Sequence, residues 1–280
     1  MKLLACLPLL LLTAAAAPSR PEPEVSPATL RAWSPREGQV HWVSDGMRIG
    51  IAPAPCETPA RTEACRWDGR NNQAEVTITS AGGAPVTLRT TDQAAYYRLG
   101  VVRLNAGDAR PGLVIENRSG GSGGDVWIQL FLPEKSGYRE VRLPGHLQGA
   151  LPGVLRDLSG DGTIDFVLGD GRFDGRFGCS ACTPRPPLVL TLRGGQPVEV
   201  SRERAYARIY REDMARLRPA CLSEGRDRNG ACAAYVADAA RIGRFGAAWT
   251  EMLRHWEREE SPLRGPESLR AFLKKTGYIS

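Results

Sequence analysis

The chain has 280 residues and a formal net charge of +6 at neutral pH. Beyond the N-terminal segment no stretch approaches the roughly 18 consecutive apolar residues of a transmembrane helix, which excludes a membrane-spanning helix from the rest of the chain. Residues 17–200 contain 20 basic and 20 acidic side chains, and residues 201–280 contain 16 and 11, so the excess positive charge lies in the C-terminal part. Such a basic tail could bind nucleic acid, an anionic surface or an acidic partner. The alternative interpretation is a solvated helical surface without a binding role.

The N-terminal segment, residues 1–16, has the features of a secretory signal peptide. Met1 and Lys2 precede the apolar run Leu3–Leu12, and small residues follow it. A positive start, an apolar core of about ten residues and a small-residue exit are typical of an export signal. We expect cleavage after Ala16, because a cut one residue later would leave Pro18 beside the scissile bond. The sequence therefore predicts a periplasmic or secreted protein, which argues against nucleic acid as the partner.

The segment after the signal, residues 17–37, is rich in Pro, Ser and Glu and lacks periodicity. This composition is typical of a disordered segment. The sequence thus predicts a disordered leader, followed by a β-rich repeat domain at residues 38–200 and a helical region at residues 201–280.

Short runs rich in β-branched and aromatic residues follow one another through the predicted β-rich domain. Clusters of Gly, Pro and Asn separate these runs, which is the pattern of consecutive strands. A Gly82-Gly83 step between two runs predicts a hairpin. The first four predicted strands are Val40–Val43, Met47–Ala52, Ala74–Thr79 and Pro85–Thr91.

An internal repeat occupies the second half of this domain. Residues 100–115 align without gaps on residues 153–168, and the two repeat units extend over about 97–143 and 150–200. Each unit predicts four strands in about 50 residues, which is the size of one propeller blade. Two units are too few to close a ring. We therefore expect an open, propeller-like stack or a sandwich, to which the strands before residue 92 can add a third unit.

Beyond Val200 the apolar pattern changes to a helical period. The joint around Gly243 resembles that of a tetratricopeptide-like hairpin, and a helical cap on the β domain is the alternative interpretation. The aromatic residues of this region lie at helical spacing, so we expect them in the core. The predicted helices are Glu203–Leu217, Ala231–Ile242, Phe245–Trp256 and Ser268–Lys275.

The sharpest candidate site is the loop DLSGDGTID at residues 157–165. Oxygen-bearing groups alternate along it, and alternating positions on a tight loop direct oxygens toward a hard cation such as Ca²⁺. Three carboxylates gathered without a cation would repel one another. Because Leu168 occupies the position of the bidentate Glu, the loop is not an EF-hand. The predicted calcium ligands are Asp157, Ser159, Asp161, Thr163 and Asp165.

A loop followed by a strand within a β repeat resembles the calcium loops of FG-GAP-type repeats, which occur in secreted and cell-surface proteins. The resemblance covers residues 153–170 well and residues 97–116 weakly. It implies a calcium site in the second copy, and the alternative is an Asp/Gly-rich turn without metal. The first copy should hold no ion, because only one of its equivalent residues could ligate. Those residues are Leu104, Ala106, Asp108 and Gly112.

Six cysteines remain after removal of the signal, and in an exported chain an even number predicts disulfides. The Cys179-x-x-Cys182 motif also admits a redox site, although no βαβ pattern surrounds it. A metal site would need a second pair at suitable spacing. The simplest scheme, which sequence leaves open, pairs Cys56 with Cys65, Cys179 with Cys182 and Cys221 with Cys232.

Together these features predict an exported, disulfide-bonded, calcium-stabilised repeat protein that acts as a non-enzymatic interaction module. Its partner would be an unknown protein or an envelope polymer. Two alternatives stay open. One is a thiol–disulfide redox protein or other envelope enzyme that uses the Cys179/Cys182 pair, and the other is a structural envelope protein with a basic helical tail. The repeat places a Gly-rich loop at residues 118–125 beside the Cys179 loop, where the Gly-rich loop could contact a ligand.

Overall fold

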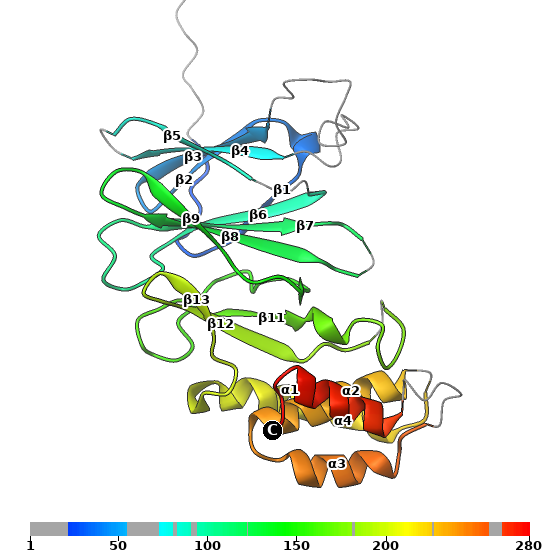
Figure 1. Ribbon diagram of the computed structural model, residues 1–280. Helices are drawn as coiled ribbons and strands as arrows, with labels where there is room; N and C mark the ends of the chain where they lie inside the picture. The colour runs from blue at the N-terminus through cyan, green and yellow to red at the C-terminus, as the bar shows by residue number, and fades with distance from the viewer. Residues whose placement is uncertain are drawn as a thin grey trace, which may run out of the picture.

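Three antiparallel sheets lie one upon another in the computed structural model, and the helices gather at one end of the stack (Figure 1). The predicted signal peptide, residues 1–16, lies outside the described residues, as do Cys56, Cys65 and Cys182. The structure describes residues 22–54, 73–80, 83–90, 94–121, 123–180, 183–225, 227–257 and 265–280.

The first sheet is a meander in the order β2-β3-β4-β5. Asp45 and Gly46 join β2 to β3 with positive φ angles of 47° and 70°. Two successive positive φ angles are typical of the type I′ turn, whose twist matches that of a hairpin. This sheet corresponds to the third unit that the sequence allows for the strands before residue 92. Its strands are β2 (Val40–Ser44), β3 (Met47–Pro53), β4 (Ala74–Ser80) and β5 (Val86–Arg89).

The second sheet adds one N-terminal strand to a meander, in the order β1-β6-β7-β8-β9. The added strand β1 runs antiparallel to β6, so that Trp33 lies opposite Tyr97. The strands are β1 (Arg31–Trp33), β6 (Tyr96–Val102), β7 (Gly112–Arg118), β8 (Val126–Pro133) and β9 (Tyr138–Arg142).

Residues 22–37 carry regular structure, which differs from the disordered leader that their composition predicts. A short 3-10 helix, η1 (Pro35–Glu37), follows β1. Leu30 and Trp33 are only 7% and 2% exposed, and the Trp33 ring N–H donates to the Gly38 carbonyl at 2.9 Å. Burial of these large apolar side chains offsets the entropy lost when the segment is ordered.

The third sheet has the order β10-β11-β12-β13, and a 3-10 helix, η3 (Gly171–Phe173), follows β11. The strand predicted near the start of the second repeat copy is reduced to isolated bridges, such as that between Val154 and Thr29. The N-terminal segment takes up backbone groups there, because the Leu155 N–H donates to the Ala28 carbonyl at 2.9 Å. The strands are β10 (Leu147–Gln148), β11 (Phe166–Asp170), β12 (Pro187–Arg193) and β13 (Gln196–Glu199).

The middle sheet is buried on both faces, which explains the near-continuous apolar runs of its strands. Successive side chains of a strand point to opposite faces. Leu99 and Ile115 accordingly pack with the first sheet, whereas Val102 and Val114 pack with the third. Two apolar layers therefore hold the stack together, one on each side of the middle sheet.

The helical region follows the third sheet and caps it. Tyr206 and Tyr210 pack against Val189 of β12 and against Val200. None of the helices in the described part of the chain is both long and apolar enough to cross a membrane. After a 3-10 turn, η4 (Arg204–Tyr206), the helices are α1 (Ala207–Leu222), α2 (Arg228–Arg241), α3 (Phe245–Leu253) and α4 (Pro266–Lys275).

These elements confirm the prediction of a mainly β chain with a helical C-terminal region. Each sheet contains a four-stranded meander, so the blade-sized unit is repeated along the chain. The described residues form an open stack of sheets and no closed ring (Figure 1).

Candidate functional site

The Asp157 loop, residues 157–165, folds through hydrogen bonds of its own. The Asp157 carboxylate accepts from the N–H groups of Gly160 and Gly162, both at 2.7 Å, and from the Ser159 hydroxyl at 3.1 Å. Both glycines have positive φ, 81° and 88°, a conformation that glycine adopts at little cost. Burial acts to raise the pKa of Asp157, but these hydrogen bonds to its ionised form lower it by more.

Asp165, the last residue of the loop, faces the protein interior and is 2% exposed. One carboxylate oxygen accepts from the N–H groups of Leu158 at 2.7 Å and Ser159 at 3.1 Å. The other accepts from the Tyr206 hydroxyl at 2.7 Å. Tyr206 belongs to η4, so the helical region reaches into the loop. Helical spacing marks Tyr206 only as a core aromatic and gives no signal for this contact.

The Asp157 loop also meets the equivalent loop of the second sheet. Asn105 and Thr163 form an antiparallel bridge, and the Ala106 N–H donates to the Gly162 carbonyl at 2.7 Å. This loop of the second sheet belongs to the first copy of the repeat, and in it the Asp108 carboxylate accepts from the Asn105 N–H at 2.9 Å, which caps the turn. The two copies of the repeat are therefore joined at their loops.

The predicted calcium ligands are not gathered into a cation-binding group. Asp161 is exposed and accepts from the Thr163 N–H at 2.8 Å, whereas Asp165 is buried against Tyr206. Across the part of the chain that the structure describes, no group of three or more His, Cys, Asp or Glu side chains is placed to hold a metal ion. As placed, these side chains do not fit Ca²⁺, which requires about six to eight converging oxygens. Calcium binding at the loop stays a prediction, and the function proposed below does not depend on it.

A second polar cluster joins one end of the second sheet to the third. The Gln148 side-chain N–H₂ on β10 donates to Asp125 at 2.9 Å and to Asp174 at 3.3 Å. Arg185 donates to the other oxygen of Asp174 at 2.7 Å and to the Ser180 carbonyl, also at 2.7 Å. The Gly-rich loop therefore lies beside the Cys179 loop, as the repeat predicts. We call Asp125, Gln148, Asp174 and Arg185 the loop edge.

The loop edge is hydrogen-bonded throughout but keeps unused polar groups. Gln148 is 4% exposed, and its carbonyl oxygen and the Arg185 Nε have no hydrogen-bond partner among the described residues. Two recesses flank the cluster. One of about 310 Å³ is lined by Tyr96, Arg118 and Asp125 with neighbouring glycines, and one of about 300 Å³ is lined partly by Gln148 and Arg185.

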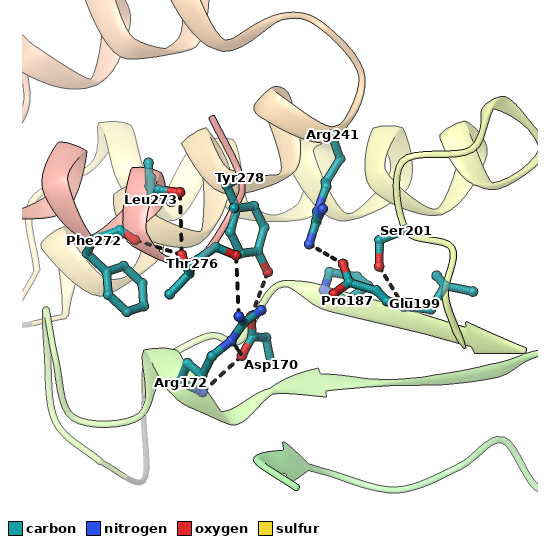
Figure 2. A network of polar contacts seen from close by, with 12 residues as sticks. Asp170, Arg172, Pro187, Glu199, Ser201, Arg241, Phe272, Leu273, Thr276 and Tyr278 are labelled. Atoms are coloured by element: carbon teal, nitrogen blue, oxygen red, sulfur yellow. Dashed lines mark hydrogen bonds and ion pairs between the residues drawn. The ribbon is translucent and has the colours of Figure 1, made fainter. Parts of the chain in front are cut away.

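Figure 2 shows a third network, which joins the C-terminal residues to the third sheet. Asp170, at the end of β11, accepts from the Tyr278 hydroxyl at 2.9 Å and from the Arg172 guanidinium at 2.6 Å. Arg241 lies 4.1 Å from the centroid of the Tyr278 ring and donates to Glu199 at 2.6 Å. Burial, and then the charge of Asp170, raise the pKa of Tyr278 well above its usual range. The network fastens the helical region to the sheet.

The cysteines support the disulfide prediction only in part. Cys221 of α1 and Cys232 of α2 are bonded and fully buried. Cys179 takes part in a disulfide, and its predicted partner lies outside the described residues. The pairs 56–65 and 179–182 therefore stay predictions.

Comparison with known proteins gives one family match, in the C-terminal region, and two relatives. Residues 210–277, from α1 to just beyond α4, match the sll0997 C-terminal domain family. The chain is 29% identical over 205 residues to the protein named "Probable thylakoid lumen protein sll0997" from Synechocystis sp. (strain ATCC 27184 / PCC 6803 / Kazusa). This match covers 65% of this chain and 60% of that protein.

A second relative, "Uncharacterized protein y4bJ" from Sinorhizobium fredii (strain NBRC 101917 / NGR234), is 25% identical over 152 residues, or 45% of this chain and 24% of that protein. No solved structure matches the chain. The resemblance to FG-GAP-type repeats stays a prediction. The chain spans less than two thirds of the length of either relative.

Proposed function

We propose that this chain is an exported, non-enzymatic interaction module whose partner binds at the loop edge and in the recesses beside it. The observation that carries the proposal is the hydrogen-bonded chain from Asp125 through Gln148 and Asp174 to Arg185. It fixes loops of two successive sheets side by side. Loops held by a rigid scaffold are where binding residues concentrate.

The side chains of the first recess suit a polar partner. Tyr96 is 56% exposed and lies opposite Arg118 on the neighbouring strand. The Arg118 guanidinium is 3.9 Å from Glu116, whose carboxylate Arg98 already binds, so it can take another anionic or carbonyl group. Exposed Tyr and Arg are the side chains that interfaces favour. The partner class that we propose is an envelope protein or an envelope polymer.

An exported location is supported by two independent facts. Cys221 and Cys232 form a disulfide, and structural disulfides persist mainly in oxidising compartments. The cyanobacterial relative is a probable thylakoid lumen protein by its name. We propose a periplasmic or secreted location for this chain on these grounds, together with its predicted signal peptide.

Capture from the envelope fraction of the source cells tests the proposal, with the purified mature protein as bait. We expect Arg118→Ala and Tyr96→Ala each to lower the retained partner about tenfold, the effect of losing one interface anchor worth about 1–2 kcal/mol. Arg193→Ala is the matched control, because Arg193 is 53% exposed and pairs with Glu203 at the other end of β12. Equal capture by all three variants would show that the loop edge is not the binding surface.

A further inference from the structure

The Tyr206 hydroxyl contacts Asp165, one of the residues that the sequence predicts as calcium ligands. It donates to Asp165 at 2.7 Å. Both side chains are buried, with Asp165 2% and Tyr206 1% exposed, so the phenol O–H serves as a donor to a buried carboxylate.

Asp165 has its charge compensated within the protein. A carboxylate offers about four lone-pair sites, and three donors already reach this one, from Leu158, Ser159 and Tyr206. A buried carboxylate without such donors would be strongly destabilising. The positive ends of the two N–H dipoles and of the phenol O–H dipole thus face the carboxylate, where they stabilise its charge as a bound cation otherwise would.

We infer that the Tyr206 hydroxyl closes the Asp157 loop in place of a cation, and that this closed loop is the joint on which the helical region docks. The inference goes beyond the proposed function, because it concerns a different surface from the loop edge. It assigns Tyr206 a positioning role for the loop.

The other contacts of the loop fit a joint. On one side the Ala106 N–H bonds the Gly162 carbonyl at 2.7 Å, and the Ile164 N–H bonds the Leu104 carbonyl at 2.9 Å, which links the loop to the second sheet. On the other side η4 carries Tyr206 into the loop. The loop therefore touches the second sheet, the third sheet and the helical region at once.

Tyr206→Phe tests the inference, with Tyr210→Phe as the matched control. Tyr210 is also fully buried near the start of α1, but its hydroxyl donates to the Pro187 carbonyl of β12 at 3.2 Å and not to the loop. We expect amide hydrogen exchange at residues 158–162 to speed up about tenfold in Tyr206→Phe, the effect of about 1.4 kcal/mol, and to stay unchanged in Tyr210→Phe. The wild-type thermal midpoint should be the same in millimolar calcium and in chelator.

Two outcomes would overturn the inference. One is a wild-type midpoint that rises with calcium, with Asp161→Ala abolishing the rise, because a cation would then hold the loop. The other is loop exchange in Tyr206→Phe that equals the control. A calcium response confined to Tyr206→Phe would support the inference, since it would show that the hydroxyl keeps the cation out.

Discussion

Asp238 of α2 is an ionisable side chain that the helical region buries completely. It is 0% exposed, and neither carboxyl oxygen has a hydrogen-bond partner among the described residues. Asp213 of α1 lies close to it and is bound on its other side by Arg216 at 2.6 Å. Burial, and then the charge of Asp213, raise the pKa of Asp238 well above its usual value. The contact between α1 and α2 therefore favours a protonated Asp238.

We expect Asp238→Asn to raise the thermal midpoint at neutral pH and to lose this advantage in acid. The folded state keeps a proton that the unfolded chain releases near pH 3.8. The contribution of Asp238 to wild-type stability is therefore greatest below that pH and falls as pH rises toward the folded pKa, whereas Asn stays neutral throughout.

Unfolding both proteins across a pH series measures the effect of Asp238→Asn. Glu267→Gln, at the exposed start of α4, is the control and should follow the wild type. A stability difference that is constant from acid to neutral pH would contradict a titrating Asp238.

The N-terminal segment is the element that links the whole stack. Glu24 bridges Val43 of the first sheet, β1 pairs with β6 of the second, and Thr29 bridges Val154 beside the third. Trp33 anchors the segment, with its ring centroid 5.5 Å from that of Tyr97. One short segment therefore contacts all three sheets, and its loss should loosen them together.

We expect Trp33→Ala to lower the free energy of unfolding by about 3–5 kcal/mol, the usual effect of removing a large aromatic side chain from a core. Trp127→Ala is the matched control, because Trp127 is 40% exposed whereas Trp33 is 2% exposed. Urea unfolding at equilibrium measures both. If the two substitutions cost the same, the segment is not an anchor and the composition-based prediction of a loose leader would hold in solution.

The elements also show which parts of the structure local sequence can predict. Alternation and turn residues place β3 almost without error, since the predicted Met47–Ala52 becomes Met47–Pro53. The pairing of β1 with β6 is non-local, and Pro and Glu around it hide a strand of only three residues. The Asp157 loop is visible in sequence as a tight turn rich in Asp and Gly. Its contact with Tyr206, 41 residues away, depends on how the helices dock, which no local pattern encodes.

At the scale of the whole molecule, the helical region is held on the sheets by polar contacts as well as apolar ones. Phe173 of η3 packs edge-on against Phe272 and Tyr278. Beside these rings Asp170 collects hydrogen bonds from Arg172 and Tyr278 (Figure 2). The same small area thus combines an aromatic cluster with a buried charge. Such a charge is strongly destabilising once one of its partners is removed.

We expect Asp170→Ala to cost about 3 kcal/mol of stability, because it leaves the Arg172 guanidinium and the Tyr278 hydroxyl without their common acceptor. Tyr278→Phe removes one hydrogen bond and should cost about 1 kcal/mol. Glu134→Ala is the surface control: its side chain is 51% exposed in an ion pair with Arg139, and such pairs contribute less than about 1 kcal/mol.

Urea unfolding gives these three costs, and limited proteolysis of α4 shows where the Asp170 variant opens. The order Asp170→Ala, then Tyr278→Phe, then Glu134→Ala is required if the polar network fastens the helices. Cleavage in α4 should accelerate in the first variant before the sheets unfold. If Asp170→Ala costs no more than Glu134→Ala, the Asp170 network does not fasten the helices, and it only satisfies a carboxylate that the packing has buried.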